Sequence, residues 1–496
     1  MKINLNDTFE KLQRIKSYKS DIINAVSDTL GLDLNNRIGD WVKQVYDYNN
    51  IEVPKVNFYD YDGTLLHSIP IFDLMEMPQL PSHPGLICQE WNWSLEDIKE
   101  YTNKYGSLNV GATYTTDDGK TRLYIDLGDN NITVPLYFNQ SASKGVKINW
   151  GDGSSEETID GTEYVNTSHT YASKGSYVIT LEVEDGELVL GQSGTYNIFN
   201  SNTSYISNIL KRLEIGENVT SIGNYAFKKC YHLRHIIIPN SIINMGYSIF
   251  SECNCLQSIT IPNGITSIKD NTFDFCHNLQ LVYLPNTITS INWYAFRKCH
   301  NLQLVYLPNT VTSIGYDVFS CCYSLQSITI PDSVTSIGEN AFSYCDSLES
   351  ITIPEGVKNI NKYTFYDCSS LQMITLPSTV IKINQYAFSN CSSLQMINIP
   401  EGVTSIGNNA FQGCKCLQSV IIPNTVTSIG SSAFSGCISI RQYDFRNCSQ
   451  VPSLSNINSF NNMTLGCKIL VPASLYNDWI NTTNWTTYAD NIVAVP

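Results

Sequence analysis

From Leu210 onward, the hydrophobic and polar positions of the chain return with a fixed period of 23 residues. Ten units follow one another without an insertion up to residue 439, and each reads approximately LQSITIPNGVTSIGxxAFxxCxS. The opening LxxIxI alternates as a short strand does, the proline ends it, and AFxxC is too short for more than a helical turn. One unit cannot bury its apolar face alone, so neighbouring units must stack. The period therefore predicts a solenoid over residues 210–447, followed by a C-terminal cap over 448–496.

The repeat LxxIxIPxxVTSIGxxAFxxC closely resembles the BspA-type leucine-rich repeat over residues 210–439. The tail, with Tyr476, Trp479, Trp485 and Tyr488, resembles the terminal segment that commonly follows such repeats. This resemblance implies a leucine-rich-repeat solenoid with a closing cap.

One position of the repeat, three residues after the phenylalanine, carries a column of cysteines, called here the cysteine ladder. A zinc site needs four converging ligands, whereas this column places one thiol at each strand spacing along a line. Each thiol also has two equal neighbours, so no unique disulfide pairing is specified. We interpret the ladder as buried thiols that act as small hydrophobic side chains, with partial disulfides as the alternative. Cys255, Cys321 and Cys416 lie outside the ladder and are expected to be more exposed. The ladder consists of Cys230, Cys253, Cys276, Cys299, Cys322, Cys345, Cys368, Cys391, Cys414 and Cys437.

Strand alternation also predicts which side chains form the concave face of the solenoid, because alternate residues point away from the core. Most units carry Ser and Thr there, but some carry Leu, Tyr or Met, and a contiguous apolar patch often marks a contact site. A recent duplication explains part of this pattern equally well, since HNLQLVYLPNT occurs at both His277 and His300. The candidate binding residues are Leu281, Tyr283, Leu304, Tyr306, Met373 and Met396.

Residues 1–50 are predicted to form two helices with apolar stripes, the first with Asp7 and Glu10 in a capping-box arrangement. Two short helices cannot form an independent core, so they are expected to pack on a partner. The stretch resembles the short helical module that begins many structural proteins of phages and prophages of gut bacteria, which implies an N-terminal anchor.

Residues 51–107 are predicted to form a small β-rich module with one helix. The letters FYDYDGTLL match the first motif of haloacid-dehalogenase-type phosphatases, with Asp60 as nucleophile, Asp62 as acid and base, and Thr64. That chemistry needs a crossover helix after the strand, whereas four prolines follow, so a hairpin turn at Asp62–Gly63 explains the letters better. The module, including EWNW with Glu90 in place of the usual glycine, resembles one seen in gut bacterial and phage surface proteins. Its helix is predicted between an N-cap at Ser94 and Gly106.

Residues 108–190 alternate with a period of two and predict an antiparallel sandwich, joined to the repeats by a linker or N-terminal cap over 191–209. The letters NWGDGSSE, HTY and GSYVITLEV resemble the polycystic-kidney-disease (PKD) domain, an immunoglobulin-like module. In that family the equivalent turn and the Tyr171 corner are structural, so the resemblance assigns Asp152 and His169 to the fold. It implies a spacer or adhesion module.

Composition narrows the function further. The 496 residues carry 30 Lys and Arg against 45 Asp and Glu, a net charge of −15 that disfavours binding to nucleic acids or anionic membranes. No apolar run reaches the length of a membrane helix, and the first residues lack the apolar region of a secretory signal. The sequence contains no HExxH, GxSxG or GxxxxGK motif, so we expect no enzyme, no cofactor and no metal site.

The chain is therefore predicted to be mainly β, with the layout of a display protein: helical start, β module, sandwich, solenoid and cap. The favoured interpretation is a non-enzymatic adhesion or structural protein of a phage or prophage particle, assembled in the bacterial cytoplasm, located in the virion and binding a bacterial surface. The alternative is a surface or exported adhesin of a gut bacterium that binds host proteins or glycans. Expected partners are a surface protein or glycan and, through the N-terminal helices, other particle proteins. We expect no nucleic acid and no membrane insertion, and an oligomer is possible.

Overall fold

The computed structural model describes residues 53–160, 165–184, 186–191, 197–199 and 208–496. The helices predicted over residues 1–50 lie outside the described residues. The described chain is mainly β, as the sequence predicts, and groups into two compact units. Within the described residues, the first unit contains 53–58, 65–79 and 94–109, and the second contains the remainder.

The first unit contains most of strand β1 (Lys55–Tyr59), strand β2 (Leu65–Pro70), the 3-10 turn η1 (Ile71–Asp73) and helix α3 (Leu95–Tyr105). Helix α3 begins as predicted, because the Ser94 hydroxyl accepts the Asp97 N–H at 3.2 Å. It ends at Gly106, whose φ of 93° favours glycine. Asn57 Nδ2 donates to Asn109 Oδ1 at 3.0 Å, which ties β1 to the start of strand β4 (Leu108–Thr116).

The predicted hairpin turn lies between β1 and β2. The Gly63 N–H donates to the Asp60 carbonyl at 3.1 Å, and Asp62 Oδ1 accepts the Thr64 N–H at 2.8 Å. Strand β3 (Leu86–Trp91) pairs antiparallel with β4 in a sheet of order β2-β1-β4-β3. The boundary expected between residues 107 and 108 therefore falls at the edge of a strand that belongs to this sheet.

The second unit contains the sandwich that the period-two alternation predicts. Its two sheets have the orders β14-β12-β5-β10-β7-β8 and β15-β13-β11-β6-β9. Side chains that face inward from both sheets, among them Leu123, Leu136 and Ile179, are fully buried. The sandwich strands are β5 (Thr121–Leu127), β6 (Ile132–Gln140), β7 (Val146–Asn149), β8 (Glu157–Ile159), β9 (Val165–Tyr171), β10 (Gly175–Val183) and β11 (Leu188–Leu190).

Both sheets of the sandwich continue into the solenoid, whereas the sequence analysis treats the two as separate domains. Strand β5 pairs antiparallel with β12 (Leu210–Glu214), and β11 pairs parallel with β13 (Val219–Ile222). Within the expected linker, the Ile198 N–H donates to the Ala226 carbonyl at 2.7 Å, and the Ile198 carbonyl accepts the Tyr137 N–H at 2.7 Å. An unpaired first coil would leave a row of backbone donors and acceptors open to other chains. The sandwich therefore serves as the N-terminal cap of the solenoid.

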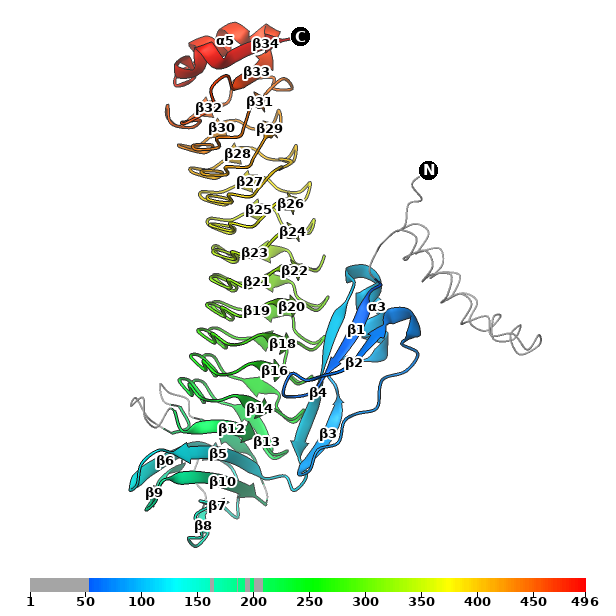
Figure 1. Ribbon diagram of the computed structural model, residues 1–496, viewed down its shortest axis with the longest axis vertical. Helices are drawn as coiled ribbons and strands as arrows, with labels where there is room; N and C mark the ends of the chain where they lie inside the picture. Colours follow the sequence, from blue (N-terminus) through cyan, green and yellow to red (C-terminus); the bar gives the residue numbers. More distant parts are fainter. Residues whose placement is uncertain (1–52, 161–164, 185, 192–196, 200–207) are drawn as a thin grey trace, which may run out of the picture. The chain divides into compact units, whose positions relative to one another are not determined.

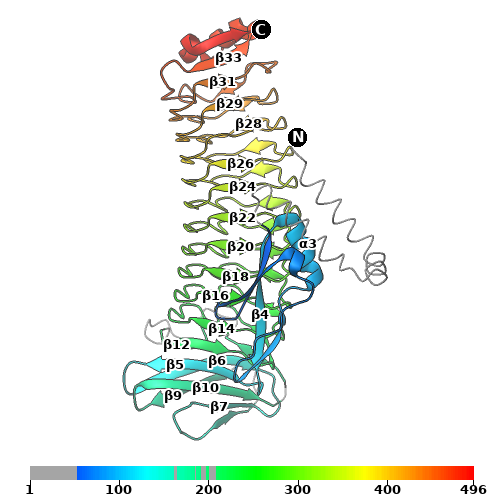
Figure 2. The same cartoon turned by 45° about the vertical axis from the view of Figure 1, so that its right-hand side comes forward.

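The solenoid has about 12 turns, because residues after the ten sequence repeats add further strands. Each coil contributes a strand from the LxxIxI segment and a shorter strand from the TSI segment, and these strands stack in parallel (Figures 1 and 2). We call the outward side of the LxxIxI strands the strand face. The LxxIxI strands are β14 (His235–Ile237), β16 (Ser258–Thr260), β18 (Leu281–Tyr283), β20 (Leu304–Tyr306), β22 (Ser327–Thr329), β24 (Ser350–Thr352), β26 (Met373–Thr375), β29 (Ser419–Ile421) and β31 (Gln442–Asp444). The shorter strands are β15 (Asn244–Met245), β17 (Ser267–Ile268), β19 (Ser290–Ile291), β21 (Ser313–Ile314), β23 (Ser336–Ile337), β25 (Asn359–Ile360), β27 (Lys382–Ile383), β28 (Ser405–Ile406), β30 (Ser428–Ile429) and β32 (Ser453–Leu454).

The interior of the solenoid is a column of phenylalanine rings. Neighbouring rings from Phe227 to Phe460 stack with centroids 5.2 to 5.8 Å apart. Each coil also turns sharply beside its phenylalanine, through two positions with positive φ that recur every 23 residues. In the last two repeats the second of these positions is glycine, Gly413 and Gly436.

The predicted C-terminal cap closes the other end. Strands β33 (Lys468–Pro472) and β34 (Ile492–Val495) extend the sheet in the order β29-β31-β33-β34. Between them lie the turn η2 (Ala473–Leu475), helix α5 (Tyr476–Asn481) and the 3-10 helix η3 (Trp485–Asn491). Trp479 and Trp485 are fully buried, and Trp485 packs against Phe460 at the end of the ring column. The cap thus covers apolar surface that the last coil would expose.

Candidate functional site

The candidate binding residues lie on the strand face, but they differ in exposure. Leu281 and Tyr283 belong to β18, Leu304 and Tyr306 to β20, and Met373 to β26, which forms an isolated parallel bridge with Met396. Met373 and Met396 are 57% and 64% exposed, whereas Tyr283 is 1% exposed. The expectation of an exposed tyrosine therefore does not hold at Tyr283.

Tyr283 is buried because residues from the start of the second unit pack on it. Asn92 Nδ2 donates to the Tyr283 carbonyl at 3.0 Å, and Trp93 Nε1 donates to the Leu284 carbonyl at 2.7 Å. Tyr59 stacks on the Tyr283 ring with centroids 5.2 Å apart. A Cβ on Gly111 would lie 2.8 Å from this ring, so the close approach requires glycine. We call residues 59–64, 80–93 and 110–116 the docked segment.

Glu90 explains the departure from the glycine expected in EWNW. Its Oε1 accepts a hydrogen bond from Asn240 Nδ2 at 3.0 Å and another from Asn263 Nδ2 at 2.5 Å. Asn240 and Asn263 occupy the same position in adjacent coils. The carboxylate therefore joins two coils to the docked segment, which a glycine could not do.

Two parts of the strand face differ as a result. Beside the docked segment, burial raises the pKa of Tyr306 to about 12, with a smaller contribution from Tyr59. Further along, Met373, Met396 and Ile421 are all more than half exposed and form an apolar strip. Sequence analysis missed Ile421, although its position at the end of an LxxIxI strand could have indicated it.

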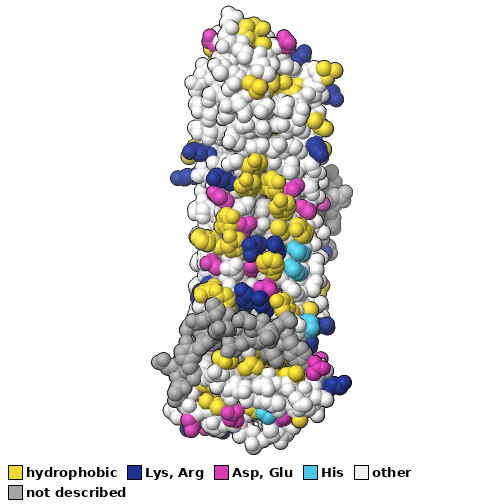
Figure 3. Space-filling model, turned by 90° about the vertical axis from the view of Figure 1, so that its left-hand side faces the viewer, with side chains coloured by type: hydrophobic (Ala, Val, Ile, Leu, Met, Phe, Trp, Pro, Cys, Tyr) yellow, Lys and Arg dark blue, Asp and Glu magenta, His cyan; other side chains and the backbone are white. Residues whose placement is uncertain are grey.

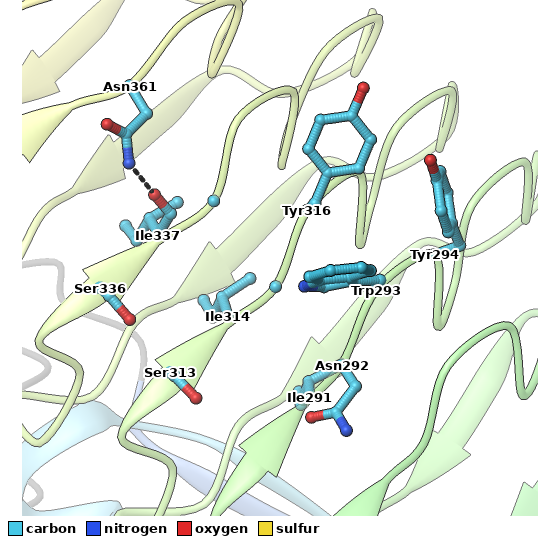
Figure 4. A pocket seen from close by; sticks show the side chains of 12 residues that line it. Ile291, Asn292, Trp293, Tyr294, Ser313, Ile314, Tyr316, Ser336, Ile337 and Asn361 are labelled. Atoms are coloured by element: carbon cyan, nitrogen blue, oxygen red, sulfur yellow. Dashed lines mark hydrogen bonds between the residues drawn. The ribbon is translucent and has the colours of Figure 1, made fainter. Parts of the chain in front are cut away.

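A second candidate surface lies on the side of the coils away from these strands. In Figure 3, hydrophobic side chains gather along the middle of one side of the solenoid, with basic and histidine side chains among them. An open groove of about 580 Å³ follows the TSI strands β19, β21 and β23. Figure 4 shows Trp293, Tyr294 and Tyr316 along one side of this groove, and Ser313, Ser336 and Asn361 along the other. Sequence analysis missed this groove, because Trp293 is a single departure from the repeat consensus.

The motif that suggested a phosphatase forms a structural network instead. Asp60 is 4% exposed, and its carboxylate accepts the Tyr114 hydroxyl at 2.5 Å and lies 2.8 Å from His83 Nε2. Nearby, burial raises the pKa of Cys88 to about 11, so this thiol stays protonated at neutral pH. Since Asp60 also begins a hairpin turn, the crossover helix that a phosphatase needs after this residue is absent here.

The residues that suggested a PKD-like module also contact one another. The Tyr171 hydroxyl donates to the Trp150 carbonyl at 2.7 Å, and His169 Nε2 lies 2.7 Å from Asp152 Oδ2. Hydrogen bonds from Ser154 and from His169 lower the pKa of Asp152 to about 2. The pair holds the turn between β7 and β8 against β9.

The cysteine ladder is buried throughout, and all ten thiols are free. From Cys253 to Cys437, each thiol donates to a phenylalanine carbonyl 26 residues earlier, at 3.0 to 3.3 Å. The ladder therefore satisfies buried carbonyls as well as filling space, a role that the sequence analysis missed. Outside the ladder, Cys255 and Cys321 are half-buried and Cys416 is exposed.

Within the described ranges, no cluster of three or more His, Cys, Asp or Glu side chains could hold a metal ion. In the same residues, no helix is long and apolar enough to cross a membrane.

The fold defines the class first: this is a leucine-rich-repeat solenoid protein. A family model described as the BspA type leucine rich repeat region matches residues 198–326 and 312–441. Through its solenoid, the chain belongs to the BspA-type leucine-rich repeat family. This class is typical of non-enzymatic binding and surface proteins, and no catalytic family is indicated.

Three solved structures are similar to the chain. A leucine rich cell surface protein from Faecalibacterium prausnitzii A2-165 is 30% identical over 51% of this chain and 76% of its own, with a TM-score of 0.34. A leucine-rich repeat protein from Bacteroides ovatus ATCC 8483 is 23% identical over 64% of this chain and 95% of its own, with a TM-score of 0.42. The leucine rich repeat protein of T. pallidum is 33% identical over 30% and 69%, with a TM-score of 0.28. A search of curated proteins found no match.

Proposed function

We propose that this chain is a non-enzymatic adhesin displayed at a bacterial surface, with the solenoid as its binding element. The observation that carries this proposal is the uninterrupted BspA-type solenoid, closed at both ends by strands of other parts of the chain. Such stacking produces a long, ordered surface on which side chains at one repeat position are presented in rows.

Two rows of the solenoid supply binding surface. The strip of Met373, Met396 and Ile421 is apolar and exposed, which is the character of a protein contact site. The groove beside Trp293 is the second. We assign the sandwich to the PKD-like modules as a part of this proposal, supported by the contact of Tyr171 with Trp150.

The other candidate is a phage or prophage particle component. It rests on the helical pattern of residues 1–50, which lie outside the described residues. The BspA-type match favours the surface location, and none of the three compared proteins is described as a particle component.

Fractionation of native culture material on a density gradient, followed by mass spectrometry, tests the proposal. We expect the chain to travel with cell envelopes. Co-sedimentation with virus-sized particles would overturn the surface location and favour the particle component. A variant that lacks residues 1–50 separates the two further, because it should lose incorporation only if these residues anchor the chain in a particle.

A further inference from the structure

The groove along β19, β21 and β23 owes its shape to two glycines. Gly315 and Gly338 occupy one repeat position in adjacent coils, and asparagine occupies that position in the coils on either side, at Asn292 and Asn361. A Cβ on Gly315 would lie 3.0 Å from Trp293 Cδ1, so the indole rests directly on this glycine. Three coil steps separate the two asparagines, about 14 Å at the spacing of neighbouring strands. The groove is thus two coils wide and closed by an amide side chain at each end.

One wall of the groove is aromatic and held in place. Trp293 is 60% exposed, although it stands in an ordered coil. Tyr294 and Tyr316 meet edge to face with centroids 5.4 Å apart, and the Arg297 guanidinium lies 4.3 Å from the Tyr294 ring centroid. Arg297 is itself fixed by two hydrogen bonds to Asp274, each 2.8 Å long. Rings held in this way lose little freedom when a ligand stacks on them.

The remaining lining determines the chemistry of the ligand. The opposite side carries the Ser313 and Ser336 hydroxyls and the Asn361 amide, and no side chain that lines the groove is charged. A charged ligand would find no partner there, while hydroxyls and amides can both donate and accept hydrogen bonds. An aromatic platform opposite neutral polar groups suits a ligand that has an apolar face and many hydroxyls.

We infer that this groove binds a neutral carbohydrate, with a pyranose ring stacked on Trp293 and sugar hydroxyls hydrogen-bonded to Ser336 and Asn361. The inference deepens the proposed adhesion function and rests on it. The chain contains its own comparison four coils later, where Gly407 and Gly430 repeat the glycine pair. There Gln385 and Asn408 replace Trp293 and Tyr316, so that site has the glycines without the aromatic wall.

The test uses the full chain on an array of neutral and acidic oligosaccharides, followed by titration of each bound sugar. We expect binding to neutral oligosaccharides. Trp293→Ala should weaken it about tenfold or more, because exposed tryptophans at binding sites carry much of the free energy. Ser336→Lys should also weaken it, since Ser336 is exposed and a lysine there would occupy the groove.

Gln385→Ala is the matched control and should bind as the unaltered chain does. Binding to acidic sugars alone, no binding at all, or equal loss in Trp293→Ala and Gln385→Ala would overturn the inference. Thermal melting of each variant shows whether it is folded. The fractionation experiment is separate: an envelope location without sugar binding would refute only the carbohydrate site, and a particle location would refute only the surface adhesin.

Discussion

At the scale of single residues, the cysteine ladder shows how a repeated side chain can do two jobs. The sequence places the thiols in the core, but their hydrogen bonds depend on how far one coil is shifted against the next. Each thiol reaches a carbonyl of the preceding coil, and an unpaired buried carbonyl is costly. This explains why a thiol, and not a methyl group, recurs at this position.

Replacing one ladder thiol should therefore destabilise the solenoid. Cys345→Ala removes the donor to the Phe319 carbonyl and should lower the free energy of unfolding by about 1–3 kcal/mol. Cys416→Ala, at an exposed thiol, should change it little. Denaturant unfolding under reducing conditions measures both, and equal effects would show that the hydrogen bond contributes nothing.

The buried thiols also predict how stability depends on pH. Burial raises the pKa of the ladder thiols from Cys230 to Cys414, so they stay protonated in the folded state. The unfolded chain releases these protons above about pH 8.5, so it then binds fewer protons than the folded chain and stability falls as pH rises. We expect a marked loss of thermal stability between about pH 8.5 and 10. The slope should be shallower in Cys345→Ala, and an unchanged melting temperature over this range would contradict the argument.

At the scale of elements, the sharp turn of each coil depends on backbone conformation more than on contacts. A left-handed position recurs in every coil, and most coils fill it with a residue other than glycine. At Gly436 φ is 75°, and an added Cβ would have no atom nearer than 3.7 Å. Substitution there thus tests backbone strain without a clash.

Gly436→Val should destabilise the chain by about 1–2 kcal/mol, because a β-branched residue strongly disfavours positive φ. Gly436→Asn should cost less, since asparagine tolerates this conformation and occupies the equivalent position at Asn390. Thermal melting compares the two variants. A valine variant as stable as the asparagine variant would mean that the turn adopts another conformation.

At the scale of the whole molecule, the sandwich and the C-terminal cap both complete a solenoid that would otherwise end in open strand edges. A repeat protein is stabilised mainly by contacts between neighbouring coils, so damage at one end should stay near that end. The pairing of β5 with β12 makes the sandwich the neighbour of the first coil.

Leu136→Ala, in the fully buried core of the sandwich, should therefore speed hydrogen exchange in the first coils, residues 210–245, more than in residues 405–440. Leu417→Ala, at an equally buried position near the other end, should produce the opposite distribution. Hydrogen exchange read by mass spectrometry distinguishes the two. A uniform response from Leu136→Ala would mean that the solenoid unfolds as one unit.

The sequence by itself determined the repeating parts of this protein. The period of 23 residues, the proline after each strand and the leucine and phenylalanine columns predict the solenoid because each coil repeats the same local rules. The caps of helix α3 and the turn at Gly63 are equally local, and both were predicted.

Only the tertiary structure decided what depends on residues far apart in the chain. Tyr283 has the strand pattern of an exposed residue, yet Asn92, Trp93 and Tyr59 cover it from nearly 200 residues away. The continuity of the sandwich with the solenoid likewise depends on strand pairing between β5 and β12, which hydrophobic alternation does not specify. The groove beside Trp293 exists because three adjacent coils combine their departures from the consensus, and periodicity averages such departures away.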